Sequence, residues 1–339
     1  MSSLAVKYRP STFEDVTEQD AIKIILTQQI KSGNIQHAYL FCGGAGTGKT
    51  TCARIFANEI NHHQGVPIEL DAASNNGVDD VREIIKQAQS KSLDSEYKIF
   101  IVDECHSISS AGWQAFLKLL EEPPAKSIFI FCTTDPQKIP KTILSRVQRY
   151  DFQRISQSGI IDRLLYILSE ENELDDGERG VSAEAVEYIA KIADGGMRDA
   201  ISLMDKCLAY SKELTLENVI KALGTVDYSV MFELLDAIIS SQISTIVTII
   251  SDIYYKGKDL KLFMKQFAQA VLDISIYTVT KTTKYTQIPN IYADKLESYL
   301  GVDGLRSLLS TLVKLNSELR WESSPKSLIE ATLILEVSK

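Results

Sequence analysis

A glycine-rich segment at residues 43–50 constrains the fold of this chain more than any other feature of its sequence. It has the pattern GxxxxGK[ST], and it lies between an apolar run at 38–42 and a helical pattern. In a strand-loop-helix context, the backbone N–H groups of such a loop wrap phosphates, its lysine reaches the β and γ oxygens, and its hydroxyl ligates Mg²⁺. The residues assigned to phosphate binding are Gly43, Gly44, Ala45, Gly46, Thr47, Gly48, Lys49, Thr50 and Thr51, with Thr50 also on Mg²⁺.

A second apolar run, residues 98–102, ends in two acidic residues. We expect Asp103 to hold Mg²⁺ through water or Thr50, and Glu104 to polarise the attacking water. Together with His106 these residues also match a DExH box, which raises a helicase as an alternative. Such a helicase needs a second sheet of similar size, and the helical remainder of the chain does not supply one. We therefore interpret His106 as a loop residue near the site.

Short apolar runs alternate with helical patterns over the first 155 residues. This alternation predicts a parallel sheet covered by helices on both faces. Strands are expected at 38–42, 68–70, 99–102 and 128–132. A helix between the last two is expected to be capped by Ser109 or Ser110 and ended by Pro123-Pro124.

After residue 155 the strand-like runs largely disappear. Residues 158–222 fit several short helices, residues 224–227 a joint, and the remainder longer helices. The net charge of −9 is concentrated in residues 158–224, which hold 7 Lys and Arg against 14 Asp and Glu. A chain-wide basic footprint for nucleic acid is therefore excluded, which leaves only local basic patches in the outer segments.

The five cysteines lie far apart and form no CxxC pair. We expect buried free thiols in a reducing compartment rather than a disulfide or zinc framework. No run approaches 18 apolar residues, and the first residues lack the apolar segment of a secretory signal. Both observations predict a cytoplasmic protein without a membrane partner.

Eight motifs occur one after another along the chain. They are Lys7-Tyr-Arg-Pro10, His37-Ala-Tyr-Leu-Phe41, Asp71-Ala-Ala-Ser-Asn-Asn-Gly77, Asp103-Glu104, Leu117-Lys-Leu-Leu-Glu-Glu-Pro-Pro124, Thr133-Thr-Asp-Pro-Gln-Lys-Ile-Pro140, Ser145-Arg146 and Gly196-Met-Arg-Asp-Ala200. In their order and spacing the chain resembles the bacterial DNA polymerase III gamma/tau family, the clamp-loader ATPases, strongly over residues 4 to about 227. The resemblance implies an α/β AAA+ nucleotide-binding domain at 1–157, a helical lid at 158–224 and an all-α oligomerisation collar at 225–339.

The resemblance also implies an activity and partners. ATP binding would let a five-subunit ring of loader subunits open a sliding clamp, and primer-template DNA would trigger hydrolysis. Arg146 would be an arginine finger acting on the neighbouring subunit's ATP, Arg198 a lid sensor, and Thr133, with Thr134 as the fallback, a sensor of the γ-phosphate. The residues implied to flank the adenine are Tyr8, Arg9, Pro10 and Val16.

Arg82 and Lys86 are candidates for DNA contact. Their i, i+4 spacing places both charges on one face of a helix. With the polar turn Ser74-Asn75-Asn76, and Asn75 in particular, they would face DNA phosphates in the ring interior. The alternative is a solvated surface pair.

The sequence departs from the family at three places. Residues 61–65 stand where a four-cysteine zinc module is usual, so we expect no zinc and no metal besides Mg²⁺. Val147 replaces the cysteine after the finger, and Glu18 stands where the family's Val-Gly-Gln motif has glycine. The chain also stops where the collar should end, so it resembles the short gamma form, from a bacterium or a phage.

Two other functions compete with the ATP-hydrolysing motor. A stator-like loader subunit binds clamp or DNA without hydrolysis, but it need not keep Lys49 and Glu104. Another AAA+ motor, such as a branch-migration ATPase, needs a winged-helix DNA reader after the lid, whereas residues 225–339 show mainly helical periodicity.

Overall fold

The computed structural model describes residues 3–338 apart from 91, 93, 175–179 and 225–227. Of the predicted joint, residues 225–227 therefore lie outside the described residues. By its internal contacts the chain divides into two compact units. The first comprises residues 1–174 and 193–202, and the second comprises residues 175–192 and 203–339.

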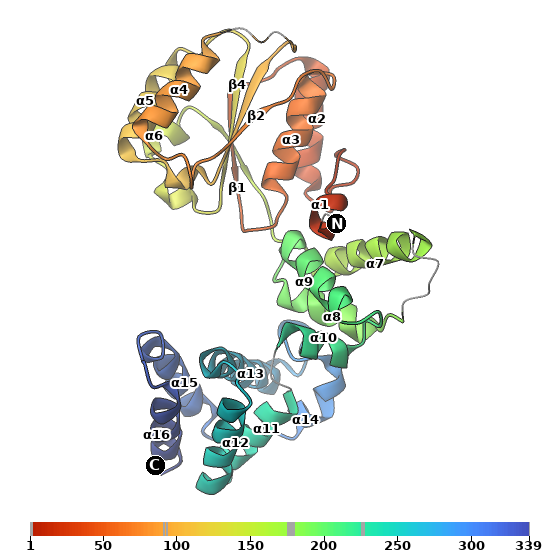
Figure 1. Ribbon diagram of the computed structural model, residues 1–339, viewed down its shortest axis with the longest axis vertical. Coiled ribbons are helices and arrows are strands. Elements are labelled where there is room, and N and C mark those ends of the chain that lie inside the picture. Colours follow the sequence, from red (N-terminus) through yellow and green to blue (C-terminus); the bar gives the residue numbers. More distant parts are fainter. Residues whose placement is uncertain (1–2, 91, 93, 175–179, 225–227, 339) are drawn as a thin grey trace. The chain divides into compact units, whose positions relative to one another are not determined.

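Five parallel strands form the centre of the first unit, in the order β2-β3-β4-β1-β5 (Figure 1). They are β1 (Ala38–Cys42), β2 (Ile68–Asp71), β3 (Lys98–Asp103), β4 (Ser127–Thr133) and β5 (Gln148–Asp151). The first four confirm the predicted strands. β5 was missed because only Tyr150 of its four residues is buried, so the strand has no apolar run.

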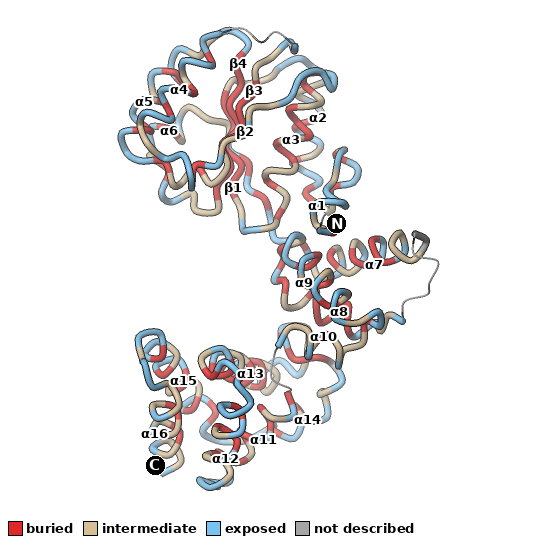
Figure 2. The backbone as a smooth tube through the Cα atoms, in the orientation of Figure 1, coloured by how far each residue is buried: buried red, intermediate tan, exposed pale blue. Residues whose placement is uncertain are grey.

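Helices cover both faces of this sheet, as predicted (Figure 2). On one face lie α2 (Asp20–Ser32) and α3 (Lys49–Ile60), and on the other α4 (Val78–Ala88), α5 (Ser110–Glu121) and α6 (Lys141–Leu144). Every residue of β1 and β4 is buried, which explains their apolar composition. The Ser109 hydroxyl accepts a hydrogen bond from the Gly112 N–H, which confirms Ser109 as the cap of α5.

The parallel arrangement brings the carboxyl ends of the strands to one edge of the sheet. β4 lies between β3 and β1, so Asp103, Thr133 and Gly43 follow one another along this edge. The Gly43 N–H donates to the carbonyl of Thr133 over 3.2 Å. Ligands bind at this edge in open α/β sheets.

Three helices complete the first unit around that edge: α1 (Leu4–Lys7), α7 (Gln157–Leu174) and the first residues of α9 (Met197–Tyr210). Short 3₁₀ turns, η1 (Cys105–Ser107) and η2 (Pro136–Lys138), follow β3 and β4. At 18 residues, α7 is longer than the short helices expected in this region.

The second unit is helical. It contains α8 (Ala183–Ile192), the remainder of α9, α10 (Leu216–Leu223), α11 (Tyr228–Ile239), α12 (Ile243–Tyr255), α13 (Leu260–Thr280), α14 (Ala293–Glu297), α15 (Leu305–Glu318) and α16 (Pro325–Val337), with the 3₁₀ turns η3 (Thr283–Tyr285) and η4 (Asn290–Tyr292). Within its described residues the only β pairing is a bridge between Val181 and Leu214. The predicted class, an α/β sheet followed by an all-α region, is confirmed.

A buried carboxylate joins two parts of the second unit. Asp273 on α13 is 1% exposed and accepts hydrogen bonds from the Gln269 amide and from the backbone N–H groups of Gln287 and Ile288. Burial raises the pKa of Asp273, and the three donors act against that rise. Lys191 on α8 donates to the carbonyl of Ile288, so the same segment is fixed from two sides.

All five cysteines are free and buried, which confirms the prediction. Burial raises the pKa of Cys42 to about 11 and that of Cys52 to about 12, so both remain thiols at neutral pH. In the described part of the chain no helix combines the length and the apolar character needed to cross a bilayer.

Candidate functional site

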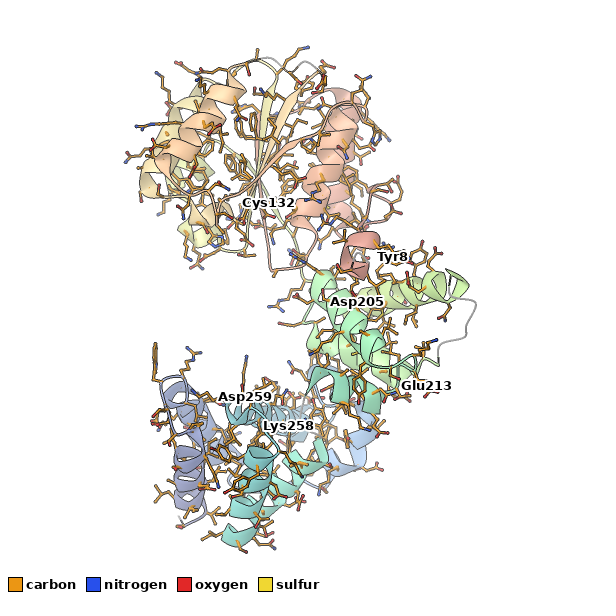
Figure 3. All side chains as sticks on the ribbon, viewed as in Figure 1. Tyr8, Cys132, Asp205, Glu213, Lys258 and Asp259 are labelled. Atoms are coloured by element: carbon orange, nitrogen blue, oxygen red, sulfur yellow. The ribbon has the colours of Figure 1, made fainter. Side chains whose placement is uncertain are left out.

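A pocket of about 430 Å³ opens at the carboxyl edge of the sheet, within the first unit. Its lining brings together residues that are far apart in the sequence. Among the predicted site residues, those that line it are Tyr8, Arg9, Pro10, Val16, Ala45, Gly46, Thr47, Gly48, Lys49, Thr50, Thr51, Asp103, Glu104 and Arg198. Figure 3 labels Tyr8, at the end of α1, and Cys132, within the sheet.

The glycine-rich segment at residues 43–50, called the phosphate loop below, turns sharply between β1 and α3. Gly48 is the N-cap of α3 with φ of 98°, and Gly46 has φ of 70°, conformations that glycine adopts without steric cost. A Cβ on Gly46 would lie 3.0 Å from the Cα of Gly196. The Gly46 carbonyl also accepts the N–H of Met197 over 3.0 Å, so the loop contacts the start of α9 directly.

Lys49 is the first residue of α3, and only 6% of it is exposed. Its ammonium group donates to the carbonyls of Gly43 and Gly44 over 2.9 and 2.7 Å. Burial lowers the pKa of Lys49, whereas the charges of Glu104 and Asp103 raise it. The ammonium therefore lies inside the loop. Burial removes water from it, and an anionic ligand would stabilise its charge in place of that water.

Thr50 and Asp103 form the link between α3 and β3. The Thr50 hydroxyl donates to Asp103 Oδ2 over 2.7 Å, and Asp103 Oδ1 accepts the Glu104 N–H over 2.9 Å. A hydroxyl and a carboxylate are oxygen ligands of the kind that Mg²⁺ prefers. The donor set thus fits the magnesium site that the sequence predicted.

Glu104 lies in the left-handed region with φ of 46°, which is uncommon for a residue with a side chain. Its Oε2 accepts a hydrogen bond from the Thr134 hydroxyl over 3.1 Å and lies 3.3 Å from Nδ1 of His106. The same nitrogen lies 3.2 Å from the Thr133 hydroxyl. Nδ1 of His106 thus lies within reach of both Glu104 and Thr133.

The sequence placed His106 near the site without a contact, and the structure gives it two. Thr133 is fully buried and accepts the N–H of Asp135 over 3.0 Å. The hydrogen bond to Glu104 comes from Thr134, the fallback residue of the prediction. The DExH pattern was the signal that pointed to His106.

The pocket walls carry more cations than acids. Five cationic side chains line it, against the three carboxylates Asp103, Glu104 and Asp199. They are Arg9, Lys49, Arg54, Arg163 and Arg198. Burial, followed by the charges of Arg54 and Arg198, lowers the pKa of Arg9. Such a wall suits a polyanionic ligand.

Sequence reasoning missed Arg54 and Arg163. Arg54 follows Thr50 by four residues on α3, so helical spacing places it on the side of the phosphate loop. Arg163 lies on α7, far along the chain, and donates to the carbonyl of Tyr8 over 3.0 Å. No motif marked it.

Arg146 does not line the pocket. Its guanidinium forms an ion pair with Glu121 at the end of α5 over 2.6 Å, and it donates to the Thr142 carbonyl over 2.7 Å and to the Ser145 hydroxyl over 3.1 Å. The structure therefore separates Arg146 from the phosphate loop of its own chain.

The candidate DNA residues also lie outside the pocket. Arg82 and Lys86 are exposed on α4, and Arg82 pairs with Asp79 over 2.9 Å. The Asn75 amide donates to the carbonyl of Asp71 over 3.1 Å. The turn is thus held by its own hydrogen bonds to Asp71.

In the segment that replaces a zinc module, His63 pairs with Glu59 over 3.3 Å. Among the residues that the structure describes, no group of three or more His, Cys, Asp and Glu side chains is arranged to hold a metal. The absence of zinc stays a prediction.

Comparison with known proteins assigns three segments of the chain to families. Residues 62–156 match the family described as DNA polymerase III, delta subunit. Residues 160–213 match the DNA polymerase III clamp loader subunit, ATPase lid domain, and residues 214–337 match domain III of DNA polymerase III subunits gamma and tau.

Individual relatives match longer parts of the chain. The DNA polymerase III subunit tau of Bacillus subtilis is 32% identical over 96% of this chain, and the Arabidopsis thaliana protein STICHEL-like 1 is 34% identical over 81% of it. The chain spans 62% and 26% of the lengths of these relatives. Among solved structures, the Thermotoga maritima RuvB Holliday junction branch migration motor has a TM-score of 0.52 at 19% identity, covering 68% of this chain and 79% of that one.

The contact between Gly46 and Gly196 gives a first prediction. Gly46→Ala places a methyl group against backbone and is expected to weaken ATP binding at least tenfold, measured by titration with a fluorescent ATP analogue. Gly33→Ala is the matched control, because Gly33 has φ of 67° with nothing within 4 Å of its Cβ position. Both changes cost about 1 kcal/mol for the backbone conformation. Equal ATP affinities of the two variants would contradict the role of the contact.

Proposed function

The chain belongs to the DNA polymerase III gamma/tau family and has the AAA+ fold, and on that premise we propose that it is an ATP-hydrolysing motor subunit of a clamp loader. The proposal is carried by one observation. Lys49 inside the phosphate loop, the Thr50–Asp103 hydrogen bond and Glu104 line a single pocket whose walls hold more cations than acids. This arrangement supports roles in binding phosphate, in holding a metal through oxygen ligands and in accepting a proton.

In the proposed reaction the loop N–H groups and Lys49 hold the β- and γ-phosphates of ATP. Glu104 accepts a proton from water as the water oxygen bonds to the γ-phosphorus. The bond from that phosphorus to the β,γ-bridging oxygen breaks, which releases ADP and phosphate. Thr50 and Asp103 would hold Mg²⁺, which offsets phosphate charge when bound.

Further residues would orient the reacting groups. The hydrogen bond from Thr134 and the close approach of His106 restrict where the carboxylate of Glu104 points, which supports its use as the base. We assign the γ-phosphate sensor to Thr133 and the lid sensor to Arg198. The N–H of Met197, the residue before Arg198, donates a hydrogen bond to the Gly46 carbonyl in the phosphate loop. Tyr8, Arg9, Pro10 and Val16 would flank the adenine.

The partners follow from the family. We propose that the chain joins companion loader subunits in a five-subunit ring, opens a sliding clamp and loads it onto primer-template DNA. The division into a nucleotide-binding domain at 1–157, a lid at 158–224 and a collar at 225–339 is part of this proposal. The cytoplasmic location stays a prediction.

Two alternatives have less support. A stator-like subunit does not need the complete set of Lys49, Asp103 and Glu104 that lines the pocket. A branch-migration motor is suggested only by a fold likeness at 19% identity, whereas residues 214–337 match domain III of gamma and tau. Capture of the full chain with a sliding clamp and loader subunits, identified by mass spectrometry, would separate these functions.

The first test of the proposal removes the base. Glu104→Gln should bind ATP but hydrolyse it about a hundredfold more slowly, the lower end of what a general base contributes. Lys49→Ala should lose tight ATP binding. Glu96→Gln, an exposed acid paired with Lys126, is the matched control for loss of one carboxylate charge. Steady-state ATPase in the assembled, DNA-stimulated complex is the measurement, and a Glu104→Gln rate near wild type would remove the base assignment.

A second test addresses Arg146 as a finger in trans, which can contribute a factor of about 10³ to 10⁵. Arg146→Ala and Lys49→Ala proteins should each be nearly inactive in assembled complexes and regain part of the ATPase when co-assembled. Mixing creates interfaces where the intact phosphate loop of one subunit faces the intact Arg146 of the other. If mixtures hydrolyse no more ATP than either variant alone, while wild type turns over normally, the trans assignment fails.

A third test concerns DNA contact by Arg82 and Lys86. Replacing both by Ala should lower DNA-stimulated ATPase more than basal ATPase. It should also reduce the slope of log affinity against log salt by about 2, because each phosphate contact releases about one counterion. The control removes Lys256 and Lys258, which are exposed in the second unit. A slope equal to that of the control would exclude the pair from the DNA path.

A further inference from the structure

Glu18 occupies an unusual position between the N-terminal segment and α7. Its backbone has φ of 56°, a conformation that favours glycine, and the family resemblance places glycine at this position. Its carboxylate accepts the Ser156 N–H through both oxygens, over 3.2 and 3.1 Å, and also accepts the Ser156 hydroxyl. Ser156 directly precedes α7, so a negative charge caps the N-terminus of that helix.

A second pair of hydrogen bonds fastens the same two segments. The Gln19 amide donates to the carbonyl of Gln153 over 2.7 Å, and its oxygen accepts the Gln153 N–H over 3.1 Å. Gln19 is buried. The space beside Glu18 is also filled, because a Cβ on Gly159 would lie 2.7 Å from Glu18 Oε1. This connection between the two segments, called the tie below, therefore consists of the Glu18–Ser156 and Gln19–Gln153 hydrogen bonds together with close packing at Gly159, and not of one surface contact.

The two tied segments form part of the pocket wall. Thr17 and Ile155, the residues next to Glu18 and Ser156, both line the pocket. The same pocket is lined by residues of the phosphate loop, by Asp103 and Glu104, and by the less polar residues Tyr8 and Val16. The Glu18–Ser156 link thus joins two segments that each contribute a residue to the pocket wall.

We propose that Glu18 is a positioning residue that fixes the wall of the nucleotide pocket where the adenosine group binds. The inference rests on the proposed function, since it takes ATP as the ligand. Glycine would adopt this backbone more easily but would lose the carboxylate. The carboxylate therefore has a use at this position: it joins the segment after Val16 to the start of α7, so that the base packs between fixed walls.

The test compares two ligands on the full chain. Inorganic tripolyphosphate presents only the phosphate chain, whereas ATP also carries the adenosine group. Glu18→Gly should fold, because glycine suits the backbone, and should bind ATP about tenfold more weakly with unchanged affinity for tripolyphosphate. Glu18→Gln keeps an acceptor oxygen and should stay within threefold of wild type for both ligands. Isothermal titration calorimetry measures the affinities, and thermal unfolding confirms that each variant is folded.

The outcomes separate the inference from the proposed function. If Glu18→Gly binds ATP as tightly as wild type, or loses affinity for both ligands equally, the positioning role is overturned. If wild type itself binds no ATP, the proposed function fails first. Should Glu18→Gly not fold, the two ligands are compared on Ser156→Ala instead, a variant that removes only one donor of the tie. It is expected to bind ATP more weakly and to keep its affinity for tripolyphosphate.

Discussion

The site depends on the hydrogen bond from Thr50 to Asp103. This bond joins α3, the helix that follows β1, to the end of β3, and β1 and β3 are not neighbours in the sheet. β4 lies between β1 and β3, so the link passes over the end of that strand, where Thr133 is buried. A shift of one residue between β3 and β4 would move Asp103 away from α3 and turn its side chain to the other face. The parallel register that pairs Val102 with Phe131 therefore sets the geometry of the acids against the phosphate loop.

Charge distribution distinguishes this edge, where the pocket opens, from a packed end of the sheet. Lys49 is largely buried against carbonyl oxygens, and Arg9 lies close enough to Arg54 and Arg198 for their charges to lower its pKa. Gathering cations in a partly dehydrated pocket is unfavourable unless an anion neutralises them. The chain as a whole is acidic, with a net charge of −9, so the cationic pocket is a local feature.

Glu104, which lines the pocket, and Glu18, which follows the lining residue Thr17, both have positive φ. Side-chain contacts hold each of them: the carboxylate of Glu104 accepts a hydrogen bond from Thr134 and lies 3.3 Å from Nδ1 of His106, and that of Glu18 accepts hydrogen bonds from Ser156. Unfavourable backbone conformations persist where surrounding contacts fix them, and such positions cluster at functional sites. The positive φ of the two glutamates is therefore consistent with their proposed roles, Glu104 as the base and Glu18 as a positioning residue.

The sequence by itself determined the phosphate loop, the acids after the third strand, four of the five strands and the helical second half, because motif spacing and apolar periodicity report local structure directly. Only the tertiary structure decided that β5 extends the sheet, that Arg163 reaches Tyr8 and that Arg146 pairs with Glu121. Periodicity shows which face of an element is buried, but not which distant segment meets it. Contacts of polar side chains across the chain leave no periodic signal, so they became visible only when the elements were packed together.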